Sequence, residues 1–117
     1  MKLVHLAAAG TIAVLGVAAL AKPEMVAPFN AHYKIKPESN LGKLHCVVCH
    51  LPGGTKLGPY GADMKKAMAA LKAKTLTPAV LKKLEALDSD KDGVKNLAEI
   101  KADSNPNDAK VKPAKKK

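Results

Sequence analysis

The sequence predicts a small, mainly α-helical protein with one domain. Two stretches, residues 60–74 and 78–87, carry apolar residues three or four positions apart, which is the spacing of one helix face. Glycine and proline are concentrated outside these stretches, where they predict loops. The 96 residues from Lys22 to Lys117, which form the expected mature chain, could hardly fill a core with their own apolar side chains, so we expect a further apolar group to complete it.

The first 21 residues predict a secretory signal peptide. Lys2 precedes an apolar run that ends in an Ala-x-Ala cleavage pattern at residues 19–21. The alternative is an uncleaved membrane anchor, because the apolar run approaches the length that spans a bilayer. We expect cleavage after Ala21 and export to the periplasm or the cell exterior.

Residues 22–40 predict an extended leader. Pro23, Pro28 and Pro37 interrupt it, and no helical period is sustained. At most a short helical turn is expected over residues 29–33.

Residues 41–76 form the predicted haem-binding segment, because they contain the motif Cys46-Val47-Val48-Cys49-His50. Two cysteines separated by two residues, with histidine directly after the second, are the attachment signature of a c-type haem. Two thiols on one short helical turn can add to the two vinyl groups of one porphyrin edge. The imidazole of His50 then falls beneath the iron as the proximal axial ligand.

A redox dithiol and half of a zinc site are the alternative interpretations of this motif. A zinc site with four ligands needs further cysteine or histidine at similar spacing, and none follows. The chain has no other cysteine and only three aromatic residues apart from histidine, so a porphyrin would be its largest apolar group. We therefore predict one covalent haem held by Cys46 and Cys49.

The second axial ligand is predicted on the helix that follows the motif. Residues 51–59 predict a loop around the haem edge, and nine extended residues can span roughly 30 Å. The helix over residues 61–74 would then lie on the far face of the haem. Its stripe comprises Tyr60, Met64, Met68 and Leu71.

Among the candidates for this distal position we favour Met68, with Met64 and His32 as alternatives. His45 is too close to Cys46 to reach the far face, and we expect it beside solvent or a propionate. Met25 is set aside because it lies in the proline-bounded leader. A core stripe without ligand function is the other interpretation of the methionines.

Residues 77–105 predict a helix, a calcium loop and a closing helix. Thr77 and Pro78 suit the N-cap and the first helical position, and the buried face would contain Val80, Leu81, Leu84 and Leu87. The loop from Asp88 to Glu99 matches the EF-hand pattern, with glycine at its sixth position. The predicted ligands are Asp88, Asp90, Asp92, the carbonyl of Val94, Asn96 and Glu99.

An acidic surface turn is the alternative interpretation of this loop. Only one such loop is present, and its eighth position is Lys95 rather than the aliphatic residue that paired EF-hands use. We therefore expect a structural calcium site rather than a calcium switch. Leu97 and Ile100 would lie on the closing helix, and residues 106–117 predict a flexible basic tail.

The basic residues are all lysine, and the formal net charge is +10. Lysine lacks the bidentate grip of arginine on phosphate, so nucleic-acid binding is not expected. The charge favours transient docking on a redox partner protein with an acidic surface, or peripheral contact with an anionic membrane. Evenly spread lysines that only keep the protein soluble are the alternative.

The CVVCH motif, the KLGPYG segment at residues 56–61 and the calcium loop at residues 88–99 together resemble small exported monohaem cytochromes c of bacteria. Those proteins end in a loop of the thrombospondin type 3 kind. The resemblance implies a cytochrome c-like helical fold and electron carriage, with Cys46, Cys49 and His50 holding the haem. It departs from the familiar pattern because no methionine follows Met68.

The expected function is one-electron transport by a carrier that is not an enzyme. A haem peroxidase or small-ligand sensor would instead need an open position on the iron. A calcium-stabilised interaction module, in which CVVCH binds no haem, is the third interpretation.

Overall fold

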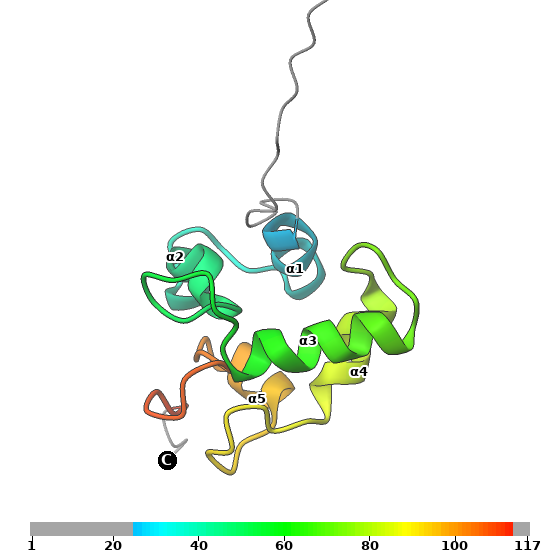
Figure 1. Ribbon diagram of the computed structural model, residues 1–117. Helices are drawn as coiled ribbons and strands as arrows, with labels where there is room; N and C mark the ends of the chain where they lie inside the picture. The colour runs from blue at the N-terminus through cyan, green and yellow to red at the C-terminus, as the bar shows by residue number, and fades with distance from the viewer. Residues whose placement is uncertain (1–24, 114–117) are drawn as a thin grey trace, which may run out of the picture.

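The computed structural model describes residues 25–113, and in this range the chain is helical with no strand. The predicted mainly helical class is confirmed. The predicted signal peptide lies outside the described residues. The helices are α1 (Val26–Tyr33), α2 (Asn40–Leu44), the 3-10 turn η2 (His45–Val48), α3 (Pro59–Ala70), α4 (Pro78–Glu85) and α5 (Asn96–Lys101) (Figure 1). None of the helices between residues 25 and 113 is long and apolar enough to cross a membrane.

Helix α4 follows the sequence prediction closely. The Thr77 side chain accepts a hydrogen bond from the backbone N–H of Val80 at 3.4 Å, which satisfies one of the free N–H groups of the first turn. Pro78 occupies the first helical position, where no N–H is needed. Leu87 was expected on the buried face, but it is 42% exposed because α4 already ends at Glu85.

Helix α3 is shorter than predicted. It ends at Ala70 instead of Lys74, and Lys72 then adopts a left-handed conformation with φ of 52°. Leu71 therefore leaves the predicted apolar stripe and is 44% exposed. Tyr60 and Met64 are buried as expected.

The prediction of an extended leader over residues 22–40 was wrong for its central part, which forms α1. Pro28 is tolerated because it occupies the first turn of the helix, where backbone N–H groups lack partners in any case. Phe29 is buried, and its ring meets Tyr60 edge to face with centroids 6.2 Å apart. This contact packs α1 against α3.

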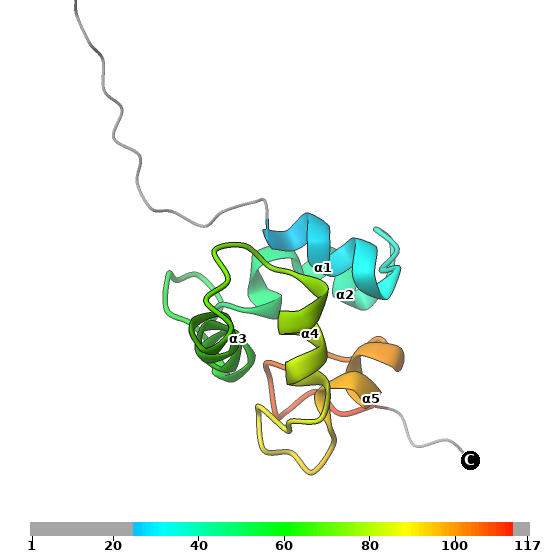
Figure 2. The same ribbon diagram turned by 90° about the vertical axis from the view of Figure 1, so that its right-hand side faces the viewer.

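Helix α1 is also bonded to α4. The Tyr33 hydroxyl donates to Glu85 Oε1 at 3.2 Å, and His32 Nε2 lies 3.7 Å from the same oxygen. Helix α1 and the α2–η2 segment lie on one side of the layer formed by α3, α4 and α5 (Figures 1 and 2). The buried core joins both parts and consists of Phe29, Leu41, Val48, Tyr60, Met64, Ala67, Leu76, Val80, Leu81, Leu84 and Ile100.

The prediction that residues 106–117 form a flexible tail was wrong at its start. Pro106 and Asn107 are buried, and the Ser104 hydroxyl donates to the carbonyl of Val111 at 2.9 Å. Just before them, the Asp103 carboxylate accepts from the backbone N–H groups of Asn40 and Leu41 at 2.8 and 2.9 Å. The chain after α5 is therefore packed against the segment that leads into the CVVCH motif.

The first turn of α3 lies so close to the motif that Gly61 cannot accept a side chain. A Cβ atom at this position would be 2.1 Å from the carbonyl oxygen of Cys49. We predict that Gly61→Ala lowers the free energy of unfolding by about 1–3 kcal/mol, as overpacking does elsewhere. Thermal unfolding followed by circular dichroism measures the loss.

The matched control is Gly54→Ala, because an added Cβ there has no heavy atom nearer than 3.7 Å among the neighbours that could obstruct it. This variant should melt close to the wild type. Equal melting temperatures for Gly61→Ala and Gly54→Ala would contradict the close packing of α3 on the motif.

Candidate functional site

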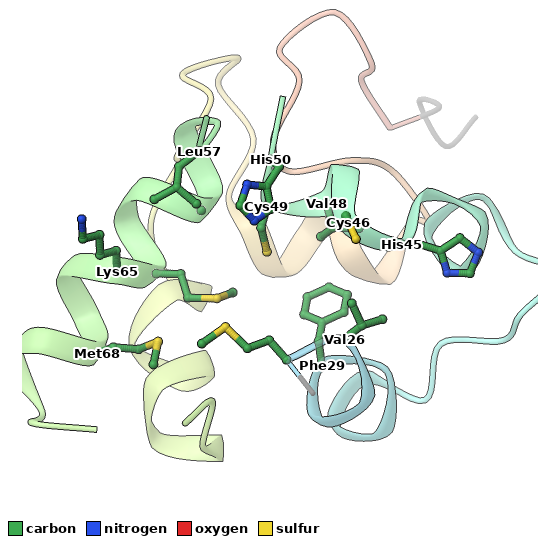
Figure 3. A pocket seen from close by; sticks show the side chains of 13 residues that line it. Val26, Phe29, His45, Cys46, Val48, Cys49, His50, Leu57, Lys65 and Met68 are labelled. Carbon is green, nitrogen blue, oxygen red and sulfur yellow. The ribbon is translucent and has the colours of Figure 1, made fainter. Parts of the chain in front are cut away.

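A cavity of about 350 Å³ lies between α1, the CVVCH segment and α3 (Figure 3). Its size is in the range of small-molecule sites. Its lining is mostly apolar, and His45, Cys46, Leu57 and Lys65 at its margin are exposed. The cavity is lined by Met25, Val26, Phe29, His45, Cys46, Val48, Cys49, His50, Leu57, Gly61, Met64, Lys65 and Met68.

One short turn presents both thiols to the cavity. The carbonyl of Cys46 accepts from the N–H groups of Cys49 and His50 at 3.1 and 2.9 Å, so the motif closes on itself. The helical segment that leads to the thiols is interrupted at His45, where φ is 48° and α2 gives way to η2. Both sulfur atoms point toward the cavity in Figure 3. Thus the structure brings together the two predicted attachment residues.

The Cys49 thiol is held in its protonated form by burial. Burial, followed by the proximity of Cys46, raises the pKa of Cys49 to about 12. A disulfide-exchanging thiol needs a lowered pKa, because the thiolate is the nucleophile. Cys49 is therefore a poor attacking thiol, and in the dithiol interpretation the exposed Cys46 would have to be the nucleophile.

His50 has one ring nitrogen occupied and the other available. Its Nδ1 atom lies 3.2 Å from the carbonyl oxygen of Thr55, which can only accept, so Nδ1 carries the proton. The neutral ring then has its lone pair on Nε2. Metal-binding histidines are generally held by a hydrogen bond of this kind on the second nitrogen.

The loop over residues 51–59 is closed rather than extended. Leu51 N–H donates to the carbonyl of Lys56 at 2.9 Å, and Gly58 N–H donates to the carbonyl of Cys49 at 2.8 Å. The chain thus returns to the motif before α3 begins. The predicted loop is present and uses only part of its possible reach, and α3 lines the cavity as expected.

Three methionines line the cavity, and only two of them, Met64 and Met68, were predicted as candidate ligands. Met64 is buried and Met68 half-buried on α3, and Figure 3 shows Met68 approaching the cavity from the side opposite the cysteines. Met25 is the third, and it was dismissed because the leader was expected to be extended. Its spacing of four residues from Phe29 was the signal that could have placed both on one helical face.

His32 does not line the cavity. It lies on α1, where its ring meets Tyr33 edge to face at 4.7 Å between centroids and its Nε2 faces Glu85. The alternative of His32 as distal ligand is therefore not supported, and the three methionines remain. His45 lines the margin, and in Figure 3 its ring points away from the two sulfur atoms.

A cluster of carboxylates occupies the predicted calcium loop. Asp88, Asp90 and Asp92 each place one carboxylate oxygen within 4.8 Å of the others. Glu99 is fully buried, and neither of its carboxylate oxygens has a hydrogen-bond partner. One oxygen of Asp90 and one of Asp92 are also buried without a partner. Unpaired buried carboxylates are costly, so this arrangement fits a bound cation.

The electrostatics of the loop agree with that interpretation. Burial, followed by the charges of Asp90 and Asp92, raises the pKa of Glu99 to about 8. Burial also raises the pKa of Asp90 to about 6. Gly93 has φ of 95°, and its N–H donates to Asp88 Oδ2 at 2.9 Å, which forms the sharp turn expected of a calcium loop.

Asn96, at the ninth loop position, has its side chain in the interior. Its Oδ1 accepts from Ser89 N–H at 3.1 Å, and its Nδ2 donates to the carbonyl of Leu84 at 2.9 Å and the hydroxyl of Ser89 at 2.8 Å. Asn96 thereby ties the loop to α4, a structural role that the sequence pattern did not reveal. Coordination by Asn96 and by the Val94 carbonyl remains a prediction.

Comparison of the chain with family models, with curated proteins and with solved structures found no match. The resemblance to monohaem cytochromes c therefore depends on the sequence motifs alone. The cavity behind CVVCH and the unpaired carboxylates of the loop are independent of that resemblance, because they arise from packing and hydrogen bonding.

The raised pKa of Glu99 makes stability depend on pH when calcium is removed. Between its ordinary value of 4.5 and about 8, the folded state holds a proton that the unfolded state has lost. Calcium-free protein should therefore become less stable as pH rises from 5 to 8. Calcium at 100 times its Kd should raise the free energy of unfolding by about 2.7 kcal/mol at pH 8. This corresponds to a Tm increase of roughly 10 °C or more.

The control is Glu99→Gln, which removes the group that titrates near pH 8. The calcium-free variant should keep only the weaker pH dependence of Asp90, which is confined to the acidic end of this range. Differential scanning calorimetry at pH 5 and pH 8, with and without calcium, measures all four states. A calcium-free wild type that melts at the same temperature at both pH values would contradict this account of Glu99.

Proposed function

We propose that the protein is an exported monohaem c-type cytochrome that carries single electrons and has a structural calcium site. The observation that carries the proposal is the cavity in which Cys46, Cys49 and His50 share one wall. Helix α3 and the N-cap residue of α1, Met25, place three thioether side chains on the other walls. This donor set matches a covalent haem with one histidine and one methionine ligand.

The chain's own residues have distinct tasks in this proposal. The bound haem would supply the one-electron chemistry. Cys46 and Cys49 would attach it, and Nε2 of His50 would coordinate the iron from the proximal side. The hydrogen bond from Nδ1 to the Thr55 carbonyl fixes the ring and raises the basicity of Nε2.

The distal wall favours a carrier over an enzyme. A peroxidase or a sensor of small molecules requires an open iron position with space for its ligand. Here the apolar side chains of Met25, Met64 and Met68 lie at the cavity. A thioether ligand would exclude small molecules and keep the iron low-spin during electron transfer.

Calcium would have a structural task in this proposal. Asp88, Asp90, Asp92 and Glu99 would share the ion, which would compensate the charge of a fully buried carboxylate. Glu99 lies on α5 and the aspartates lie between α4 and α5, so the ion would join these helices. A calcium-stabilised interaction module without haem is the second candidate function, and the haem measurement below distinguishes the two.

Exposed lysines are available for partner docking. Every lysine between residues 25 and 113 is exposed, and in this range only Lys66 has a carboxylate partner, Asp63 at 3.4 Å. The motif itself is bordered by the exposed apolar side chains of Leu51 and Leu57. We infer a transient partner with an acidic surface, or an anionic membrane surface as the alternative.

Covalent attachment is the direct test of the proposed cofactor. Protein made with the haem-attachment machinery should keep its colour with the polypeptide after extraction in acidified acetone. The double variant Cys46→Ala, Cys49→Ala should be colourless after the same treatment, because no thioether can form. Colour that moves into the acetone from the wild type would contradict covalent attachment.

The distal ligand is predicted to be a methionine, with Met68 still favoured and Met64 and Met25 as alternatives. A methionine ligand gives the oxidised protein a weak sulfur-to-iron charge-transfer band in the far red. We expect this band in the wild type and its loss in only one of Met25→Leu, Met64→Leu and Met68→Leu. The matched control is His32→Ala, which should keep the band.

The absorption spectra of these variants also test the choice between carrier and enzyme. A wild type that lacks the band and has a high-spin iron that binds small ligands would support the peroxidase or sensor. A wild type that lacks the band but stays low-spin would exclude methionine ligation.

A further inference from the structure

Asn107 makes three hydrogen bonds behind the cavity from a segment that is distant in the sequence. Its side chain is buried, with 6% exposed. Its Nδ2 donates to the carbonyls of Val47 and His50, both at 3.2 Å, and its Oδ1 accepts from the N–H of Tyr60 at 2.9 Å. These contacts use both donor hydrogens and the acceptor of the amide.

The three partners of Asn107 belong to opposite walls of the cavity. Val47 and His50 belong to the haem motif, whereas Tyr60 is the second residue of α3, the helix that carries Met64 and Met68. The N-cap residue of α3 is Gly58, which has no side chain to cap the helix. Asn107 therefore acts as the cap and bonds α3 to the motif at the same point.

Gly58 provides the space that this amide occupies. A Cβ atom at position 58 would be 2.3 Å from Nδ2 and 2.4 Å from Oδ1 of Asn107. The backbone of Gly58 has φ of −82°, which any residue can adopt. The requirement for glycine here thus comes from Asn107 and not from the backbone conformation.

Two local hydrogen bonds order the short stretch of backbone that connects the calcium loop to Asn107. Glu99 is the last residue of that loop, and its carbonyl accepts from Ser104 N–H at 2.8 Å. Asn105, the next residue, accepts at its Oδ1 from the N–H of Asn107 at 3.0 Å. These two bonds hold the segment between α5 and Asn107 in a tight turn.

We propose that Asn107 is a positioning residue that fixes the spacing between His50 and α3, and that it couples this spacing to calcium in the loop. The proposal rests on the proposed haem and calcium sites. Calcium orders Glu99 and α5, the segment after α5 presents Asn107, and Asn107 fastens both walls of the cavity. By linkage, a change in one site then alters the other.

The test is the affinity of the ferric, haem-loaded protein for imidazole, which competes with the distal ligand. Releasing α3 from the motif should make the distal ligand easier to displace. With calcium bound, Asn107→Ala and Gly58→Ala should bind imidazole about tenfold more tightly than the wild type, a typical size for coupling between sites. Removing calcium should raise the affinity of the wild type about tenfold but that of either variant by less than about twofold.

Two matched controls should behave as the wild type does. Asn30→Ala removes an amide that makes no side-chain hydrogen bond to any described residue, and Gly54→Ala adds a methyl group where there is space. The proposal is overturned if the Asn107 and Gly58 variants match the wild type in calcium. It is also overturned if calcium removal changes their affinity as much as it changes that of the wild type.

Hydrogen exchange at the Tyr60 amide gives a readout that depends neither on haem nor on a substitution. This N–H donates to Asn107, so removing calcium from the full wild-type chain should speed its exchange about tenfold. Unchanged exchange would overturn the coupling even if the protein is a cytochrome. If exchange becomes faster but the covalent-attachment test finds no haem, the coupling is supported and the proposed function is contradicted by the missing haem.

Discussion

The apolar cavity between α1, the CVVCH segment and α3 is the constraint on which the rest of the structure depends. The chain has one phenylalanine, two tyrosines and no tryptophan, so it has few large side chains with which to fill such a space. Its core residues are instead arranged around the cavity: Phe29, Val48 and Met64 belong to both. A covalent haem would add the missing apolar volume, which makes the cofactor part of the hydrophobic core as well as the functional group.

Polar interactions then fix the elements that surround the cavity. The chain after α5 contacts both ends of the motif segment, through Asp103 at the start of α2 and Asn107 at the end of η2. Glu85 on α4 accepts a hydrogen bond from Tyr33 on α1. Because α4 and α5 flank the carboxylate cluster, the proposed calcium ion would support the same framework from the opposite side. A structural ion in this place would explain why a small chain keeps a fully buried glutamate.

The sequence predicted the features that depend on local chemistry. The caps at Thr77 and Pro78, the thiol-bearing turn and the three aspartates of the loop follow from neighbouring residues, and each appears in the structure. The errors concern long-range contacts. Helix α1 forms because Phe29 can pack on Tyr60, and the buried tail depends on partners about 60 residues away. The local sequence of α1 does not reveal that Tyr60 is its partner. The local sequence of the C-terminal segment likewise does not reveal its contacts with the motif.

The predicted site shows the same difference between features set by neighbouring residues and features set by long-range contacts. The attachment cysteines and His50 could be identified because one motif contains all three, and the structure places them on one wall. Met25 was set aside as a distal ligand, and His32 was retained as one, for the same reason. The positions of both side chains depend on whether α1 forms and which way it faces. Asn107 belongs to no motif, and the calcium-loop pattern that contains Asn96 does not reveal its bonds to α4. These structural roles are visible only in burial and hydrogen bonds.

The most direct test of the central claim is the intact mass of the exported protein, made in a bacterium that attaches haem to c-type cytochromes. The account predicts a chain that begins at Lys22 and is heavier by one haem, with no thiol at Cys46 or Cys49 left to react with an alkylating agent. A chain of unmodified mass with two alkylatable cysteines would contradict it. In that case the cavity and the calcium loop would have to be explained without a porphyrin.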